Sequence, residues 1–227
     1  MTPQGERAYY LSSSHTIASR ADFDAYPWPD PADADYSPFE LMAAILPDGM
    51  KVITGGPGGV LENVMWLLGY EGVSLLLYED RELVRDLFDA VGSRIAGHIE
   101  RAAALDVVGA IMLGDDLGFR TQTMLSPAVL REFCFPWHAR IVEAAHRHGK
   151  PAILHACGNV SEVMEDILAC GWDARHSFED AIEPVWEAKA RWGDRIALVG
   201  GFDMDKLARF NPRQVRDYTR WLISKCG

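Results

Sequence analysis

The sequence predicts an α/β fold built on a parallel sheet, and two observations carry that prediction. From residue 50 onward, short apolar runs alternate with longer amphipathic stretches at a spacing of roughly 25–45 residues, which is typical of βα units. Polar residues gather where the apolar runs end, and both a (β/α)₈ barrel and a doubly wound sheet place their active sites there. We expect five strands, and the clustering favours an enzyme.

Two regions differ in character along the chain. Residues 1–49 are expected to form an irregular wrap rich in proline and aromatic residues, because each proline in the stretch 26–31 (YPWPDP) fixes φ and removes a hydrogen-bond donor. A linker is the alternative for this stretch. Residues 50–227 are expected to form the α/β domain.

Bulk composition excludes several classes of partner. The 227 residues carry a net charge of −11, which argues against nucleic acid and against an anionic membrane surface. Four cysteines show no disulfide framework, and neither a secretory leader nor a membrane-length apolar run is apparent. We expect a cytoplasmic protein that acts on a small molecule, with a homo-oligomer left open.

The expected strands are short and apolar, and they span residues 51–54, 107–113, 152–154, 173–177 and 196–200. The expected helices follow them, at residues 60–69, 81–104, 127–149, from Asn159 or Ser161 to Gly171, 182–191 and 212–225. Residues 55–59 (GGPGG) follow the first strand like a phosphate loop, but they lack a Lys-Ser/Thr ending, so a plain turn is favoured.

Two adjacent carboxylates end the most apolar strand. Asp115 and Asp116 follow residues 107–113 directly, and a desolvated carboxylate there is suited to acid or base catalysis. A solvated strand end is the alternative reading. Arg120 and Asp203 lie at equivalent places, and we expect them to contact substrate, with Arg120 neutralising one of the carboxylates.

The stretch 151–180 carries the sharpest chemical signal. His155 and Cys157 are two residues apart at a strand end, so their side chains point to the same face. Imidazole and thiolate are preferred zinc ligands, and Glu179 at the end of the next strand offers an oxygen. We therefore predict a Zn²⁺ site on His155, Cys157 and Glu179, with His176 as a substitute ligand. A buried structural pair is the alternative.

Four motifs in order resemble a known family. They are Gly-Asp-Asp-Leu-Gly at 114–118, Leu-His-Ala-Cys-Gly-Asn at 154–159, His-Ser-Phe-Glu-Asp at 176–180 and Val-Gly-Gly-Phe-Asp at 199–203. With most of residues 26–227, they resemble the uroporphyrinogen decarboxylase superfamily, most closely its corrinoid-dependent methyltransferases that methylate coenzyme M or other thiols. The resemblance implies a (β/α)₈ barrel, also similar to that of cobalamin-independent methionine synthases.

The resemblance also bears on the site. It implies that His155, Cys157 and Glu179 are zinc ligands and that a corrinoid carried by a partner protein is a methyl donor. Asp115 matches an aspartate of the decarboxylases other than their pyrrole-binding one. The decarboxylases themselves are metal-free and use an Arg-rich N-terminal segment that is not found here, and His-x-Cys is foreign to them.

Measured against the family pattern, the chain is expected to be an incomplete barrel. A first strand or two and the final strand, with its cysteine ligand, have no counterpart, and Cys226 is not expected to replace that cysteine. Three functional hypotheses follow: a zinc-dependent methyltransferase, a metal-free uroporphyrinogen decarboxylase (a lyase of porphyrin biosynthesis), and a non-catalytic degenerate barrel that serves as a binding module.

Overall fold

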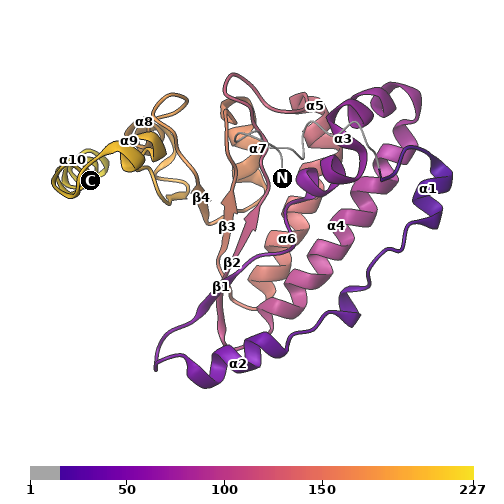
Figure 1. Cartoon of the computed structure of the whole chain (residues 1–227), viewed down its shortest axis with the longest axis horizontal. Helices are drawn as coiled ribbons and strands as arrows, with labels where there is room; N and C mark the ends of the chain where they lie inside the picture. The colour runs from indigo at the N-terminus through magenta and orange to yellow at the C-terminus, as the bar shows by residue number, and fades with distance from the viewer. Residues whose placement is uncertain (1–15) are drawn as a thin grey trace.

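The structure, a computed structural model, describes residues 16–227, and its centre is a parallel sheet (Figure 1). The strands are β1 (Val52–Thr54), β2 (Val108–Gly114), β3 (Ala152–His155), β4 (Ala174–His176) and β5 (Ala197–Leu198). All neighbouring pairs are parallel, and the spatial order is the chain order, β1-β2-β3-β4-β5. An order without reversal is that of a barrel wall, whereas a doubly wound sheet reverses direction at a switch point.

Helical segments separate the strands. The α-helices are α1 (Arg20–Ala25), α2 (Ser37–Ile45), α3 (Val60–Glu79), α4 (Arg81–Ala103), α5 (Pro127–Val129), α6 (Phe135–Arg147), α7 (Met164–Ala169), α8 (Val185–Trp192), α9 (Met204–Arg209) and α10 (Pro212–Cys226). Shorter turns are the 3₁₀ segments η2 (Pro31–Asp33) and η4 (Ser161–Val163) and the π-helical η3 (Leu130–Cys134).

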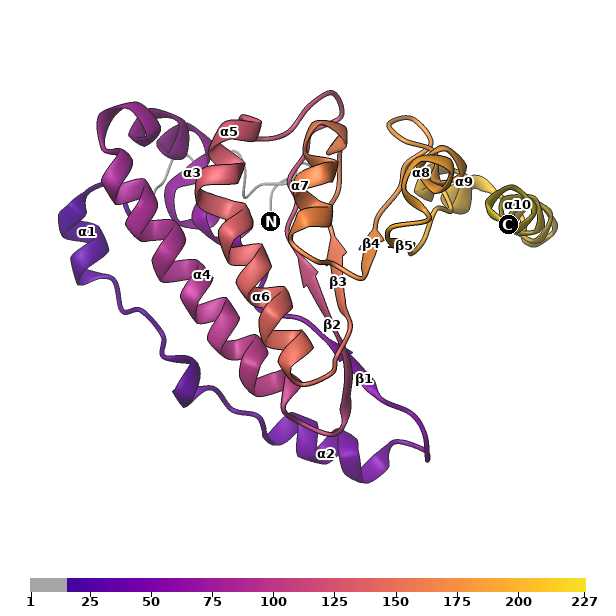
Figure 2. The same ribbon diagram turned by 180° about the vertical axis from the view of Figure 1, so that it is seen from behind.

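The main core lies between the sheet and one layer of helices. Helices α4 and α6 run side by side against β1–β3 in both views (Figures 1 and 2). Alternate strand residues such as Ile111, Leu113 and Leu154 are fully buried towards this layer. On the opposite sheet face Met112 is only half-buried and Ile53 is exposed. One face of the sheet is therefore covered by helices and the other is largely open.

The C-terminal segment forms a second, smaller cluster. Helices α8, α9 and α10 lie together beyond β4 and β5, away from α4 and α6 (Figures 1 and 2). Their buried apolar cluster consists of Phe178, Val185, Ala188 and Leu222. This cluster is small compared with the main core, which extends from α3 to α7.

Several elements differ from expectation. Helix α3 continues past residue 69 to Glu79, bending at Gly69 (φ +71), because the apolar stretch beyond the glycine resumes helical geometry. The wrap contains α1 and α2, started by the Ser19 cap and by Pro38 at the beginning of α2. The expected wrap over residues 1–15 lies outside the described residues.

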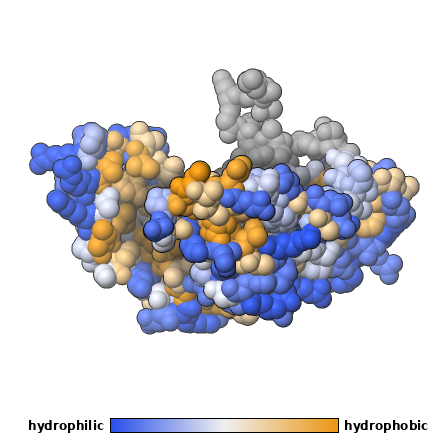
Figure 3. Space-filling model, turned by 90° about the horizontal axis from the view of Figure 1, so that it is seen from below, coloured by the Kyte–Doolittle hydropathy of each residue, from blue (hydrophilic) through white to orange (hydrophobic). Residues whose placement is uncertain are grey.

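Within residues 16–227, α3 is the one helix with the length and apolar composition of a membrane span, and its buried residues also fit a core helix. The surface seen in Figure 3 carries apolar patches. Large apolar side chains are exposed along α2, in the turn that follows it and in β1: Leu41, Met42, Ile45, Met50 and Ile53.

Candidate metal site at the ends of β2, β3 and β4

Three chemically active side chains converge where β2 and β3 end. His155 is the last residue of β3 and pairs with Gly114 of β2, so Asp116 and Cys157 lie just beyond the same sheet edge. Residues 155 and 157 share the face that the helices leave open, as the two-residue period of a strand requires. The common face predicted for His155 and Cys157 is therefore present in the structure.

The distances between these groups suit a shared cation. Nε2 of His155 lies 3.6 Å from Oδ1 of Asp116 and 3.5 Å from Sγ of Cys157. All three ligand atoms lie within 4.8 Å of one another. Oδ1 of Asp116, whose side chain is nearly buried, accepts a hydrogen bond from the backbone N–H of Cys157 at 2.9 Å. Carboxylate, imidazole and thiol are together a donor set that fits zinc.

A second histidine adjoins the group. His176 ends β4 and pairs with His155 across the sheet, and the Nδ1 atoms of the two rings are 2.5 Å apart. Burial, and secondarily the neighbouring His155, lower the pKa of His176 below its ordinary value.

Glu179, the third zinc ligand predicted from the sequence, stands apart from this group. Its side chain is exposed, and it lies in a recess lined also by Gly158, Arg175 and Ser177. Among residues 16–227, the carboxylate oxygen that groups with His155 and Cys157 belongs to Asp116, which was expected to act as acid or base. The role of Glu179 as a ligand stays a prediction.

Asp115 faces the opposite way, into the helix layer, and is fully buried. Its carboxylate accepts hydrogen bonds from the first backbone N–H groups of α3, at 2.9 Å from Val60, 3.1 Å from Leu61 and 3.0 Å from Glu62. Only glycine fits at the start of this helix, because a Cβ on Gly59 would lie 2.1 Å from the Asp115 side chain. Asp115 thus caps α3 from a distant strand, and its predicted acid–base role remains untested.

A buried side-chain group surrounds Asp115 on its other side. Nε2 of His138 lies 2.7 Å from Oδ2 of Asp115, and the Cys134 thiol lies 3.8 Å from the same oxygen. Burial, followed by the Asp115 charge, raises the pKa of Cys134 well above its usual range, so the sulfur stays protonated. Asp115, Cys134 and His138 also lie close enough together to share a cation. The Asp115 carboxylate, however, already accepts three backbone N–H groups of α3, so its evident role is to hold the start of that helix.

Sequence reasoning missed Glu62. Burial and the nearby Asp115 charge raise its pKa to about 7, while the backbone N–H groups of Gly59 and Asp116 oppose that rise. Glu62 therefore exchanges a proton near neutrality, directly beside Asp116. The available signal was a glutamate at the third position of a helix that follows a strand and a glycine turn.

The predicted substrate contacts lie elsewhere. Asp203 caps α9 by accepting the backbone N–H of Lys206 at 3.0 Å, and it also accepts that of Asp180 at 3.3 Å. Arg120 is exposed in the connection that follows β2. Asp203 does not belong to the group formed by Asp116, His155 and Cys157.

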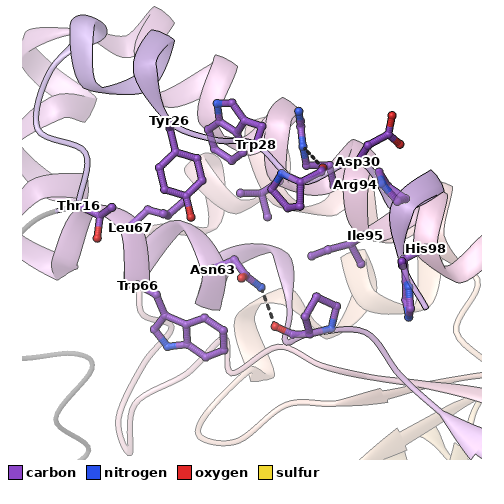
Figure 4. A pocket seen from close by; sticks show the side chains of 15 residues that line it. Thr16, Tyr26, Trp28, Asp30, Asn63, Trp66, Leu67, Arg94, Ile95 and His98 are labelled. Atoms are coloured by element: carbon purple, nitrogen blue, oxygen red, sulfur yellow. Dashed lines mark hydrogen bonds between the residues drawn. The ribbon is translucent and has the colours of Figure 1, made fainter. Parts of the chain in front are cut away.

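A cavity of about 440 Å³ lies outside this site, between the N-terminal segment and helices α3 and α4 (Figure 4). Tyr26 and Trp28 of the N-terminal segment line one side of it, and Trp66 of α3 with Arg94 and His98 of α4 line the rest. None of the residues predicted to act in chemistry lines it. The side chains that could share a metal ion converge at the strand ends and not in this cavity.

Parallel strands in chain order, covered by helices on one face and carrying polar side chains at their ends, are the arrangement found in part of a (β/α)₈ barrel. Residues 12–226 match the model of the uroporphyrinogen decarboxylase (URO-D) family. The chain therefore belongs to that family, and the predicted barrel-type α/β fold with five parallel strands is confirmed.

Relatives come from both branches that the motifs resemble. Uroporphyrinogen decarboxylase of Anaeromyxobacter sp. (strain Fw109-5) is 29% identical over 209 residues, covering 89% of this chain and 57% of that protein. Methylated-thiol–coenzyme M methyltransferase of Methanosarcina mazei is 32% identical over 104 residues, covering 45% of this chain and 27% of its own length. This chain thus spans just over half the length of the decarboxylase.

A solved structure supports the same architecture. The methyltransferase from Methanosarcina mazei superimposes with a TM-score of 0.58 at 20% identity, covering 71% of this chain and 45% of that one. At this identity the similarity concerns the fold alone.

Proposed function

We propose that the chain acts as a zinc-dependent methyltransferase that moves a methyl group from a corrinoid protein or a small donor to a thiol. The observation that carries the proposal is the convergence of Asp116, His155 and Cys157 within 4.8 Å at the strand ends. The relatives include a methylated-thiol–coenzyme M methyltransferase. The resemblance of the sequence motifs to that branch implies His155 and Cys157 as a ligand pair.

Zinc held by these three residues would supply a Lewis acid that lowers the pKa of a substrate thiol. The chain's own groups prepare the site. Asp116 fixes the backbone of Cys157 by accepting its N–H, which sets the spacing between the carboxylate and the sulfur. Glu62, with its pKa of about 7, is the group suited to take up the thiol proton and return it to solvent.

Metal analysis of protein purified without chelators tests the site. We expect about one zinc per chain in the natural protein, since three ligands leave a fourth position for substrate. Zinc should fall to near zero in His155→Ala/Cys157→Ser. Asp116→Asn should lower the zinc content, whereas Glu179→Gln should retain it; the reverse result would restore Glu179 as the oxygen ligand. Zinc absent from the natural protein, or unchanged in the double variant, would overturn the proposal.

Activity is measured with methylcobalamin as donor and coenzyme M as acceptor. Loss of the methylcobalamin absorbance should depend on thiol and should be abolished in the double variant. A second candidate, metal-free decarboxylation, is favoured by the decarboxylase that matches 89% of the chain. Incubation with uroporphyrinogen separates the two, because only the decarboxylase releases CO₂ stepwise from it.

A further inference from the structure

The contact between His155 and His176 is unusual because it joins two identical atoms. The residues face each other across β3 and β4, with ring centroids 4.8 Å apart and an angle of 30° between the ring planes. Their Nδ1 atoms are 2.5 Å apart, within hydrogen-bond reach. A neutral imidazole has one N–H and one lone pair, so this contact needs a single proton on one of the two Nδ1 atoms.

Which of the two histidines donates this proton determines whether Nε2 of His155 carries a proton or a lone pair. Its Nε2 faces Oδ1 of Asp116 and Sγ of Cys157. If His155 carries its proton on Nδ1, then Nε2 presents a lone pair to the same space as the carboxylate and the sulfur, which suits a cation. If the proton is on Nε2, it points at those acceptors and closes the site to metal.

We propose that His176 is a positioning residue for the metal site. When a divalent cation is bound, Nδ1 of His176 accepts the Nδ1–H of His155, and this hydrogen bond keeps Nε2 of His155 free and aimed at Asp116 and Cys157. Metal-bound histidines commonly donate their second N–H to such a partner, which fixes both tautomer and ring orientation. The inference rests on the proposed zinc site, but the histidine pair itself does not need zinc.

The backbone holds His176 in place for this role. Its carbonyl accepts the N–H of Ala156 at 2.7 Å, and Ala156 lies between the proposed ligands His155 and Cys157. Gly200 leaves room for the ring, since a Cβ there would lie 2.7 Å from a carbon of the His176 imidazole. The pair is therefore placed by the sheet, not by a flexible loop.

Zinc affinity, measured by competition with a chromophoric chelator, tests the positioning role. His176→Phe keeps a ring but removes the acceptor, and it should weaken zinc binding about 10–100-fold. His176→Asn places an amide oxygen near the position of Nδ1, and it should stay within about threefold of the natural protein. His146→Phe is the matched control, because His146 contacts Asp173 at the opposite end of β3; its zinc affinity should not change. Unchanged affinity in His176→Phe would overturn the inference.

X-ray absorption of the zinc-loaded protein distinguishes positioning from coordination. One imidazole in the coordination sphere supports the proposal. Two imidazoles would show that His176 is itself a ligand, and would overturn it.

Nuclear magnetic resonance of ¹⁵N-histidine-labelled protein tests the pair without metal. A ¹⁵N–¹⁵N coupling between the two Nδ1 atoms is expected in the metal-free protein, and its absence would overturn the inference while leaving the zinc site standing. After zinc is added, the proton should reside on Nδ1 of His155; a proton on His176 would contradict the proposal. If the coupling is present but the natural protein holds no zinc, the proposed function fails and the histidine pair stands.

Discussion

Asp115 and Asp116 are neighbours in the chain but face opposite sides of the sheet. Asp115 points into the helix layer and holds the start of α3, whereas Asp116 points to the open face beside His155. The alternation of strand residues causes this division, because Asp115 follows the parity of the buried Ile111 and Leu113. Asp115 therefore stabilises the fold, whereas Asp116 belongs to the candidate metal site.

Asp115→Asn should destabilise the protein strongly. The amide NH₂ would face backbone N–H groups that now donate to a carboxylate, so we expect a loss of about 2–4 kcal/mol in the free energy of unfolding. Urea denaturation measures it. The control is Asp80→Asn at the cap of α4, where asparagine serves nearly as well, with an expected change below about 0.5 kcal/mol. Unchanged stability with lost activity would instead support a chemical role for Asp115.

Glu62 should make stability depend on pH. Its pKa in the folded protein, about 7, exceeds the ordinary value of 4.5, so the folded state binds the proton more tightly than the unfolded state. The contribution of Glu62 to the free energy of unfolding is fully present below pH 4.5 and is lost as the pH rises through 7. Glu62→Gln should remove this loss. Between pH 5 and pH 8, the unfolding free energy of the variant should fall by roughly 1–2 kcal/mol less than that of the natural protein, after allowance for solvent screening. Denaturation at both pH values checks it, and equal declines would contradict it.

At the scale of elements, an ion pair joins β4 to the segment that leads into α8. Arg175 of β4 is 2% exposed, and its Nη1 donates to Glu183 at 2.8 Å. Its guanidinium also stacks over Phe178, 4.7 Å from the ring centroid. The buried ion pair between Arg175 and Glu183 therefore connects the sheet to the small C-terminal cluster.

Glu183→Ala should destabilise the protein, because Arg175 is buried. Removing one partner leaves Arg175 uncompensated, so we expect a loss of about 3–5 kcal/mol in unfolding free energy. Glu187→Ala, which removes the exposed partner of Arg191, is the control and should cost less than about 0.5 kcal/mol. Thermal or urea unfolding of both variants measures the difference, and similar small effects would show that Arg175 reaches solvent.

Strand positions were predictable from the sequence to within a few residues, because short apolar runs bounded by Gly or Pro fit few other secondary structures. The ends of the helices were less predictable. The bend at Gly69 let α3 continue beyond its predicted end. The short helices depend on local signals rather than on a long apolar period: α1 and α9 on side-chain caps, and α2 on a proline in its first turn.

The candidate site was predictable where it depends on strand geometry. His155 and Cys157 share a face because they are two residues apart, and that follows from the sequence. Glu179 lies beyond the paired part of β4, where the chain is no longer held by alternation, so its direction could not be inferred. Glu62 could not be placed either, since nothing local to α3 shows which strand its first turn meets.

At the scale of the whole molecule, apolar burial is unevenly distributed. Buried residues run along α4 from Leu83 to Ala103, whereas α10 buries only Leu222 and exposes Trp221 and Ile223. Regions with little buried apolar surface open at lower free energy than the core to which they are attached.

Native-state hydrogen exchange should therefore show two levels of protection. Amides of α10 should exchange through openings at least about 2 kcal/mol lower in free energy than those of α4 and α6. The comparison is internal, because all three helices are measured in one sample. Equal protection would show that the C-terminal helices unfold only together with the main core.

The agreement between strand order and chain order has a consequence for synthesis. Each strand pairs with the one made just before it, so the sheet can grow as the chain leaves the ribosome. Asp116, His155, Cys157 and His176 are all translated before β5 and α8–α10. The candidate metal site and most of the buried core can thus assemble on a nascent chain, and α8–α10 dock onto a surface that is already folded.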